Sequence, residues 1–264
     1  MKRPILLSLA LATALATALA AAACNTRKQG EVIPTFAVAA SLRNALPELQ
    51  EAFRRAPGGG EVVATYGASG ELKREVEAGA PIDGVLFAAG APVDALVEAG
   101  LVTAASRKPV ATNKLVLVGP RLPEKETPPR FETLPSLPAG SRIAVGDPRT
   151  VPVGQYARES LTRLGVWEKI QDRLVFGGDV AATLAYARRG EVTVAIVYST
   201  DLEGIPELTV YEEAKGDFAP HPEVVGGITQ ASAAKPRAAA FLRFLLSPQG
   251  QKILEKHGFG PPPE

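Results

Sequence analysis

The stretch Ile143-Ala-Val-Gly-Asp-Pro-Arg-Thr-Val-Pro-Val-Gly-Gln-Tyr-Ala157 contains a strand, a polar turn and the start of a helix. The apolar run to Val145 predicts a short strand, and Gly146 and Pro148 end it because both residue types interrupt regular structure. Helical periodicity then continues to Leu164. The first N–H groups of such a helix have no intrahelical partner, so they can hold an anion. An ordinary strand-to-helix connection has the same pattern, so this stretch alone does not establish a site.

Similar junctions recur along the chain. Apolar runs predict strands at 34–40, 61–66 and 84–88, each followed by helical spacing. This alternation predicts a parallel sheet with helices on both faces. Further strands are expected at 113–119, 173–176, 192–198 and 208–211, and a short one follows the loop that begins at 218.

Five residues lie just beyond the ends of predicted strands, where open α/β sheets bind their ligands. They are Ser41, Ser69, Val153, Val180 and Tyr198. Each serine has a simpler interpretation as a helix N-cap, a position that serine favours.

Three local expectations concern the connections. Ser41 is predicted to cap a helix over 42–53, which Pro47 should kink or split. In the proline-rich stretch 120–140, Phe131 and Leu134 are the expected anchors in the core. Ser247-Pro248 is expected to cap a final helix.

The N-terminus has the pattern of a secretory signal peptide, with Lys2 and Arg3 before an uncharged apolar run that ends in Ala-Ala-Ala-Cys24. Because Cys24 is the only cysteine and follows small residues, residues 1–24 are interpreted as a signal peptide with a lipobox. Acylation at Cys24 would anchor the protein to a membrane. Cleavage near Ala23 with an incidental cysteine is the alternative. A permanent transmembrane helix fits the flanks and length less well.

Composition excludes several classes of function. Removing Lys2 and Arg3 leaves 27 basic residues against 28 acidic ones, whereas nucleic-acid binding calls for a basic patch. The two histidines and single cysteine form no transition-metal cluster, so no metal or cofactor is expected. Gly67-Ala-Ser-Gly70 superficially resembles a nucleophile elbow, but Glu71 stands where that motif needs glycine. The sequence therefore predicts a protein that is not an enzyme.

A binding function needs only donors aimed at one point. Hydroxyls of Ser41, Ser69 and Tyr198, with backbone N–H groups of Val153 and Val180, could supply them. A buried dianion is costly unless it is fully hydrogen-bonded, and several donors with helix dipoles could offset that cost.

The chain resembles the periplasmic molybdate-binding proteins of bacterial ABC importers, in the same order over essentially the whole mature sequence. The similar segments are Phe36-Ala-Val-Ala-Ala-Ser-Leu42, Tyr66-Gly-Ala-Ser-Gly-Glu-Leu72, Glu77-Ala-Gly-Ala-Pro-Ile-Asp83, Asn113-Lys-Leu-Val-Leu-Val118, Ala144-Val-Gly-Asp-Pro148, Val151-Pro-Val-Gly-Gln-Tyr156, Gly178-Asp-Val180 and Ala195-Ile-Val-Tyr198. The chain departs from that family at Phe87-Ala-Ala89, where a Ser-Ala-Asp-like stretch is usual, and at Val153, where alanine is frequent.

The resemblance implies an α/β, two-lobed type II periplasmic-binding-protein fold with two doubly wound sheets, a hinge and an interlobe cleft. It implies that Ser41 and Ser69 of one lobe, with Val153 N–H, Val180 N–H and the Tyr198 hydroxyl of the other, hold molybdate or tungstate as an oxyanion. Expected limits are 31–112 and 221–264 for lobe 1 and 113–220 for lobe 2.

The expected partners are the oxyanion and an ABC permease, with no nucleic acid. The protein should be a monomer outside the cytoplasm, anchored through Cys24. Two alternatives remain: a binder of sulfate or a similar oxyanion, and a sensing lipoprotein on the same fold with no transport role.

Overall fold

The computed structural model describes residues 32–263. The predicted signal peptide and Cys24 lie outside these residues. Among the residues described, no helix combines the length and apolar character needed to cross a membrane.

The first of two sheets has the strand order β2-β1-β3-β10-β4. Its strands are β1 (Thr35–Ala39), β2 (Val63–Gly67), β3 (Gly84–Phe87), β4 (Lys108–Thr112) and β10 (Glu223–Ile228). β1 is parallel to β2 and β3, as predicted, but β10 is antiparallel to β3 and β4. The parallel arrangement expected from the first three strands is therefore confirmed for those strands, and β10 makes the whole sheet mixed. The chain enters β10 directly from the second sheet, and no crossover helix imposes a parallel direction.

The second sheet has the order β7-β6-β8-β5-β9. Its strands are β5 (Leu115–Pro120), β6 (Ile143–Gly146), β7 (Leu174–Gly177), β8 (Val194–Tyr198) and β9 (Leu208–Glu213). β6 is parallel to β7 and β8, whereas β5 is antiparallel to β8 and β9. We call the elements built on the first sheet the first lobe and those built on the second sheet the second lobe.

The chain passes between the two sheets twice, between β4 and β5 and between β9 and β10. The two crossing segments are hydrogen-bonded to each other, because Asn113 N–H donates to Pro222 O at 2.9 Å. The Asn113 side chain also donates to the Thr200 hydroxyl at 2.9 Å. The strand β4, which precedes the first crossing, was not predicted.

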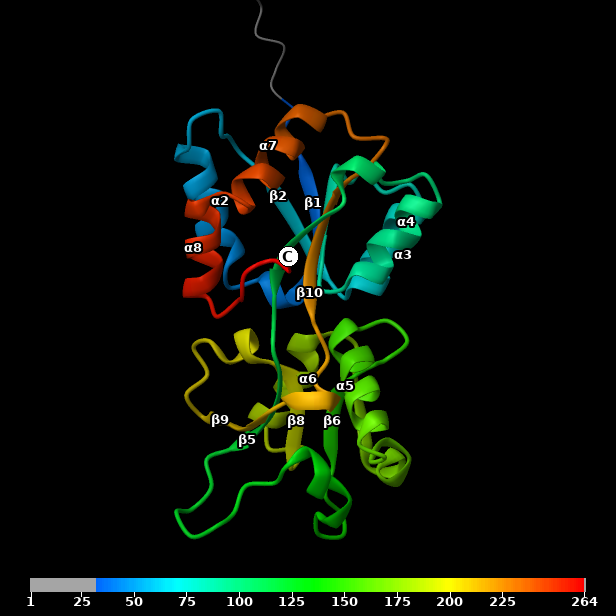
Figure 1. Cartoon of the computed structure of the whole chain (residues 1–264), viewed down its shortest axis with the longest axis vertical. Coiled ribbons are helices and arrows are strands. Elements are labelled where there is room, and N and C mark those ends of the chain that lie inside the picture. Colours follow the sequence, from blue (N-terminus) through cyan, green and yellow to red (C-terminus); the bar gives the residue numbers. More distant parts are fainter. Residues whose placement is uncertain (1–31, 264) are drawn as a thin grey trace, which may run out of the picture. The chain divides into compact units, whose positions relative to one another are not determined.

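Helices cover both faces of the first sheet, with α2, α7 and α8 on one side and α3 and α4 on the other (Figure 1). The α-helices are α2 (Leu46–Arg55), α3 (Ser69–Glu77), α4 (Gly90–Glu98), α5 (Pro152–Arg163), α6 (Val180–Arg188), α7 (Lys235–Leu245) and α8 (Pro248–Lys256). The short 3₁₀ helices are η1 (Ala40–Leu42), η2 (Ala104–Ser106), η3 (Phe131–Ser136), η4 (Trp167–Lys169), η5 (Gln171–Arg173), η6 (Ser199–Leu202) and η7 (Gly216–Phe218).

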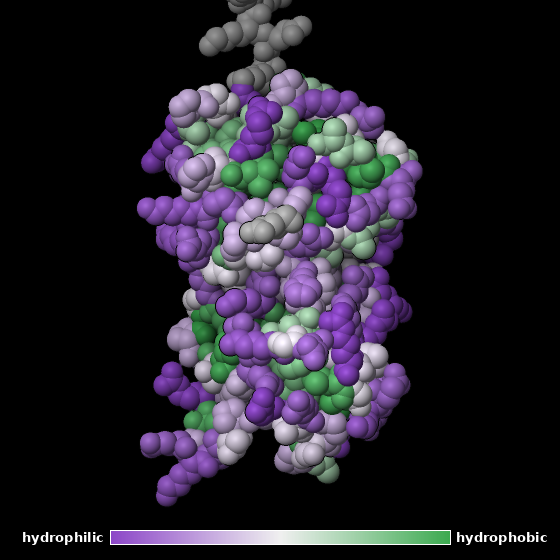
Figure 2. All heavy atoms as spheres, viewed as in Figure 1, coloured by the Kyte–Doolittle hydropathy of each residue, from purple (hydrophilic) through white to green (hydrophobic). Residues whose placement is uncertain are grey.

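Strand β1 explains the two-sided packing. Phe36 and Val38 belong to one buried cluster and Ala37 to another, because successive side chains of a strand point to opposite faces. Both faces are apolar, as expected for a strand covered by helices on each side. On the face of the molecule in Figure 2, hydrophilic residues predominate and hydrophobic ones form smaller patches.

Two local predictions are confirmed and one is wrong. Phe131 and Leu134 are fully buried, and Ser247 Oγ caps α8 by accepting from Gly250 N–H at 3.2 Å. The predicted capping role of Ser41 is wrong, because Ser41 lies inside η1. The helical pattern is split, and α2 starts only at Leu46. Pro47 therefore lies in the first turn of α2, where a backbone N–H would have no intrahelical partner and proline is tolerated.

Candidate anion-binding site

A small cavity lies between the carboxyl ends of β1, β2 and β3 and the starts of α5 and α6. All five predicted site residues line it: Ser41, Ser69, Val153, Val180 and Tyr198. Its volume is about 10 Å³, close to the smallest space that holds one water molecule. Such a void suits a compact ion rather than a larger organic solute.

Ser41 comes from η1, directly after β1. The residue is 6% exposed, and its Oγ is buried without a hydrogen-bond partner among the described residues. A buried hydroxyl without a partner costs about 1–3 kcal/mol. Because Ser41 Oγ lies in the cavity wall, it could donate a hydrogen bond to a ligand bound there.

Ser69 is the first residue of α3, directly after β2. Its Oγ is buried and accepts a hydrogen bond from Ala88 N–H at 3.1 Å. A hydroxyl that accepts through a lone pair keeps its own proton to donate. Ala88 thus orients the Ser69 hydroxyl while its proton remains available to an acceptor in the cavity.

The second lobe supplies backbone N–H groups. Val153 and Val180 lie in the first turns of α5 and α6, and within residues 32–263 neither N–H has a hydrogen-bond partner. Gly154 allows α5 to start close to the end of β6, because a Cβ there would lie 1.9 Å from Gly146 O. Both helix starts direct positive dipole ends at the cavity.

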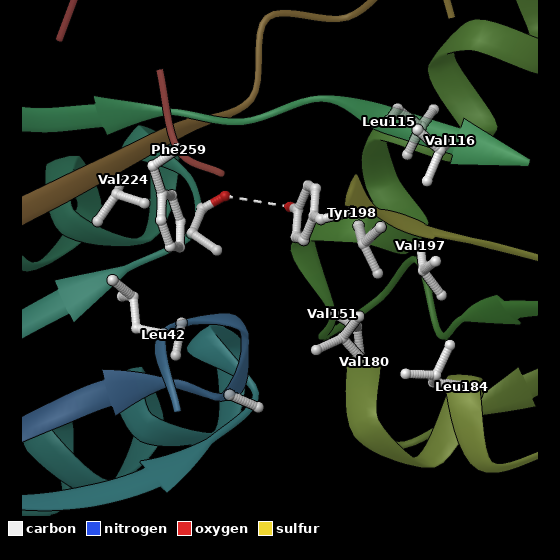
Figure 3. Close-up of a cluster of buried hydrophobic side chains, with 14 of the residues drawn as sticks. Leu42, Leu115, Val116, Val151, Val180, Leu184, Val197, Tyr198, Val224 and Phe259 are labelled. Atoms are coloured by element: carbon white, nitrogen blue, oxygen red, sulfur yellow. Dashed lines mark hydrogen bonds between the residues drawn. The ribbon is translucent and has the colours of Figure 1, made fainter. Parts of the chain in front are cut away.

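Tyr198 contributes the fifth polar group from the end of β8. Its hydroxyl crosses to the first lobe and donates to Ala88 O at 3.3 Å (Figure 3). Burial raises the pKa of Tyr198 well above its ordinary value. The hydroxyl therefore keeps its proton throughout the physiological range, and it can donate to a ligand by turning away from Ala88.

Of the described residues, no lysine or arginine lines the cavity, and Asp179 is the charged residue of its wall. Asp179 Oδ1 caps α6 by accepting from Ala182 N–H at 2.6 Å. Asp201 lies nearby and accepts from Tyr198 N–H at 2.9 Å. Burial raises the pKa of Asp201 to about 8, although that hydrogen bond lowers it, so Asp201 is largely uncharged at neutral pH. Positive potential in the cavity therefore comes from the helix starts.

The two lobes also meet beside the cavity, at a contact the sequence did not indicate. Gly70 N–H of α3 donates to Thr150 O at 3.0 Å. A Cβ at Gly70 would lie 2.6 Å from Thr150 O, so the lobes approach this closely only because residue 70 is glycine.

Sequence reasoning also missed Ala88. Its N–H donates to Ser69 Oγ and so orients that hydroxyl, and its carbonyl oxygen accepts the hydrogen bond from the Tyr198 hydroxyl. The sequence feature that could have drawn attention to Ala88 was the departure from the family pattern at Phe87-Ala-Ala89.

The polar groups of the cavity are mainly donors, and two different lobes provide them. This arrangement suits a ligand that accepts hydrogen bonds on every side, such as a fully deprotonated oxyanion. Among the described residues, no group of three or more His, Cys, Asp or Glu side chains could hold a metal ion.

Two α/β lobes joined by two crossings, with a cavity between them, define the type II periplasmic-binding-protein fold. The model of the bacterial extracellular solute-binding protein family matches residues 34–260, and the chain belongs to this family.

Individual relatives extend over nearly the same range. The chain is 33% identical over 231 residues to the molybdate-binding protein ModA of Escherichia coli (strain K12), covering 85% of this chain and 88% of ModA. It is 32% identical over 237 residues to YvgL of Bacillus subtilis (strain 168), which carries the provisional name of an ABC transporter substrate-binding lipoprotein, with 89% of each chain covered. The solved periplasmic molybdate-binding protein of Azotobacter vinelandii has the same fold, with a TM-score of 0.77 and 21% identity over 87% of this chain and 100% of that one.

Proposed function

We propose that this protein binds molybdate in the cavity between its lobes through uncharged donors. The observation that carries the proposal is Ser41 Oγ, a buried hydroxyl in the cavity wall with no partner among the described residues. A bound oxyanion would accept from Ser41, Ser69 and Tyr198 and from the N–H groups of Val153 and Val180. The molybdate-binding name of the Escherichia coli relative supports this choice of ligand.

Size and protonation narrow the ligand class. The cavity is too small for an organic solute, so its ligand must be compact. The polar groups of the wall are mainly donors, so an anion that carries its own proton would place that proton opposite one of them. The site therefore favours unprotonated tetrahedral oxyanions. Molybdate and tungstate meet this condition, and sulfate is the alternative that differs from them in size.

The wider function follows from the ligand and the family. We propose that closure of the lobes traps the anion and that the protein delivers it to an ABC permease as a monomer, without catalysis. We place the lobe boundaries at 112/113 and 220/221, between the strands of the two sheets. We also propose that Cys24 is acylated and anchors the protein outside the cytoplasm; the lipoprotein name of the Bacillus relative supports this. A sensing lipoprotein without a permease is the alternative.

The test is calorimetric titration of a chain that begins at Asn25 with molybdate, tungstate, sulfate and phosphate. We expect one-to-one binding of molybdate and tungstate, with little heat from phosphate. Preferential binding of sulfate would favour the alternative function, binding of sulfate or a similar oxyanion. The absence of binding to any of the four would refute the proposal and favour the sensing function.

A matched pair of variants tests the role of Ser41. Ser160 in α5 is also fully buried, and its Oγ also lacks a partner among the described residues, but it does not line the cavity. We expect Ser41→Ala to weaken molybdate binding by about 1–3 kcal/mol and Ser160→Ala to leave it unchanged. Neither variant should lower the stability of the unliganded protein, because each removes a hydroxyl without a partner. Equal affinities for the two variants would exclude Ser41 from the site.

A further inference from the structure

His257 lies between the two lobes, away from the proposed anion site. It follows α8 in the first lobe, and its side chain is 9% exposed. Its Nε2 is 3.0 Å from Glu48 Oε2 of α2, in the same lobe. Its Nδ1 is 2.7 Å from Glu203 Oε2, which follows η6 in the second lobe. One imidazole thus contacts a carboxylate from each lobe.

The protonation state follows from the two partners. Ionised carboxylates only accept hydrogen bonds, whereas a neutral imidazole donates from one nitrogen alone. Both contacts of His257 are therefore satisfied together only when the ring is the doubly protonated cation. Burial lowers the pKa of His257, but the hydrogen bonds to Glu203 and Glu48 outweigh it, so this pKa is raised above its ordinary value.

Other charged groups surround this contact. Lys256 Nζ pairs with Glu48 at 2.7 Å, within the first lobe. On the other side, Glu203 lines a cavity of about 320 Å³ together with Arg43, Arg188 and Asp201. Arg188 is paired with Glu207 at 2.8 Å, and Arg43 lies 4.7 Å from the centre of the Tyr66 ring. Of the ion pairs made by His257, the one to Glu203 is the pair that joins the lobes.

We propose that His257 is a pH-dependent clasp, whose protonated ring binds Glu48 and Glu203 and so holds the two lobes closed. When the lobes separate, His257 keeps Glu48 but loses Glu203. Closure therefore raises the proton affinity of the ring, and a proton is taken up on closing at pH values between the open and closed pKa of His257. The stabilisation of the closed state is complete below the open-state pKa. It is lost as the pH rises through the closed-state pKa.

The consequence for the ligand rests on the proposed function. If the cavity binds an anion in the closed state, then affinity should fall at alkaline pH. Asp201 acts in the same direction, because its deprotonation near pH 8 adds negative charge beside the cavity. The two effects are separable, since replacing Glu203 removes the clasp and leaves Asp201 in place.

The first experiment measures His257 directly and needs no ligand. The chain has two histidines, so proton NMR gives two imidazole titration curves, with His221 as the internal reference. Glu203→Gln should reduce the proton affinity of His257 at least about threefold and leave the His221 curve in place. Glu191→Gln, which removes a second-lobe carboxylate paired with Arg189, is the control and should change neither curve. An unchanged His257 curve in Glu203→Gln would overturn the proposal.

The second experiment measures closure. A chain beginning at Asn25 contains no cysteine, so spin labels at Arg74→Cys in α3 and Arg158→Cys in α5 report the distance between the lobes. Raising the pH from about 5.5 to about 8.5 should lengthen this distance in the unliganded protein, and the change should disappear in the labelled Glu203→Gln variant. A pH-dependent distance that persists in Glu203→Gln would overturn the clasp.

Molybdate titration separates the two proposals. Over the same pH range, we expect the dissociation constant to rise about threefold to tenfold more in the wild type than in Glu203→Gln. An equal rise in both would overturn the link between clasp and affinity and assign the pH dependence to Asp201. Failure to bind molybdate at any pH, with the NMR and distance changes present, would refute the proposed ligand and support the clasp.

Discussion

The two halves of the cavity are built from different chemical groups. The first lobe contributes side-chain hydroxyls, from Ser41 and Ser69, whereas the second contributes backbone N–H groups at the starts of α5 and α6. A hydroxyl is lost with a single substitution, but an N–H survives every replacement except proline. The difference teaches that the first half depends on residue identity and the second on where helices begin. Tyr198 is the exception, as a side-chain donor in the second lobe.

The largest effect is expected for Ser69→Ala, because Ser69 both faces the cavity and accepts from Ala88 N–H. We expect molybdate affinity to fall by about 1.5–3 kcal/mol, the range for hydrogen bonds to charged groups. Unlike Ser41→Ala, this variant should also lower the free energy of unfolding by roughly 1–3 kcal/mol, because a buried N–H loses its partner. Calorimetry and denaturant titration measure the two losses. A loss of affinity without a loss of stability would contradict the positioning role of Ala88.

An intermediate effect is expected for Tyr198→Phe. The hydroxyl must leave Ala88 O before it can donate to an anion, so its net contribution should be smaller, roughly 0.5–1.5 kcal/mol of binding free energy. Because burial raises the pKa of Tyr198, the difference from the wild type should be constant between about pH 6 and pH 9. Calorimetry across this range tests both statements. A difference that disappears at high pH would mean that the hydroxyl ionises there.

The smallest effect on binding is expected for Val153→Ala, because the donor is the backbone N–H. Affinity should change less than about twofold, while the free energy of unfolding should fall by roughly 1.5 kcal/mol through the loss of two buried carbon groups. Val153→Ala should thus keep molybdate affinity and lose stability, whereas Ser41→Ala should lose molybdate affinity and keep stability. A large loss of affinity in Val153→Ala would show that the start of α5 had moved or that the side chain itself contacts the ligand.

Much of the fold could be predicted because apolar runs and helical spacing are local. The strands up to β3 and those of the second sheet follow from such runs, and the buried anchors Phe131 and Leu134 were also predictable. The direction of β10 was not, because it depends on how the chain returns from the other sheet. β4 was missed since Lys108 and Pro109 weaken the strand pattern of a short segment.

The candidate site was predictable as a set of positions but not as a network of contacts. Resemblance and strand ends brought together five residues that line one cavity. The serine pattern also suggested that Ser41 was a helix cap, and this was wrong because Ser41 lies inside η1 and α2 starts only at Leu46. The absence of a partner for Ser41 Oγ became visible only when the surrounding groups were in place.

The amino-acid sequence by itself determined the alternation of strands and helices, the burial of β1 on both faces and the positions where helix starts can present N–H groups. Tertiary structure alone decided which distant groups meet. Tyr198 reaches Ala88 across 110 positions of the chain, Gly70 meets Thr150, and His257 contacts Glu203. The physical reason is that propensity and periodicity act over a few neighbouring residues. Hydrogen bonds and ion pairs between lobes depend instead on how two separately formed sheets approach each other.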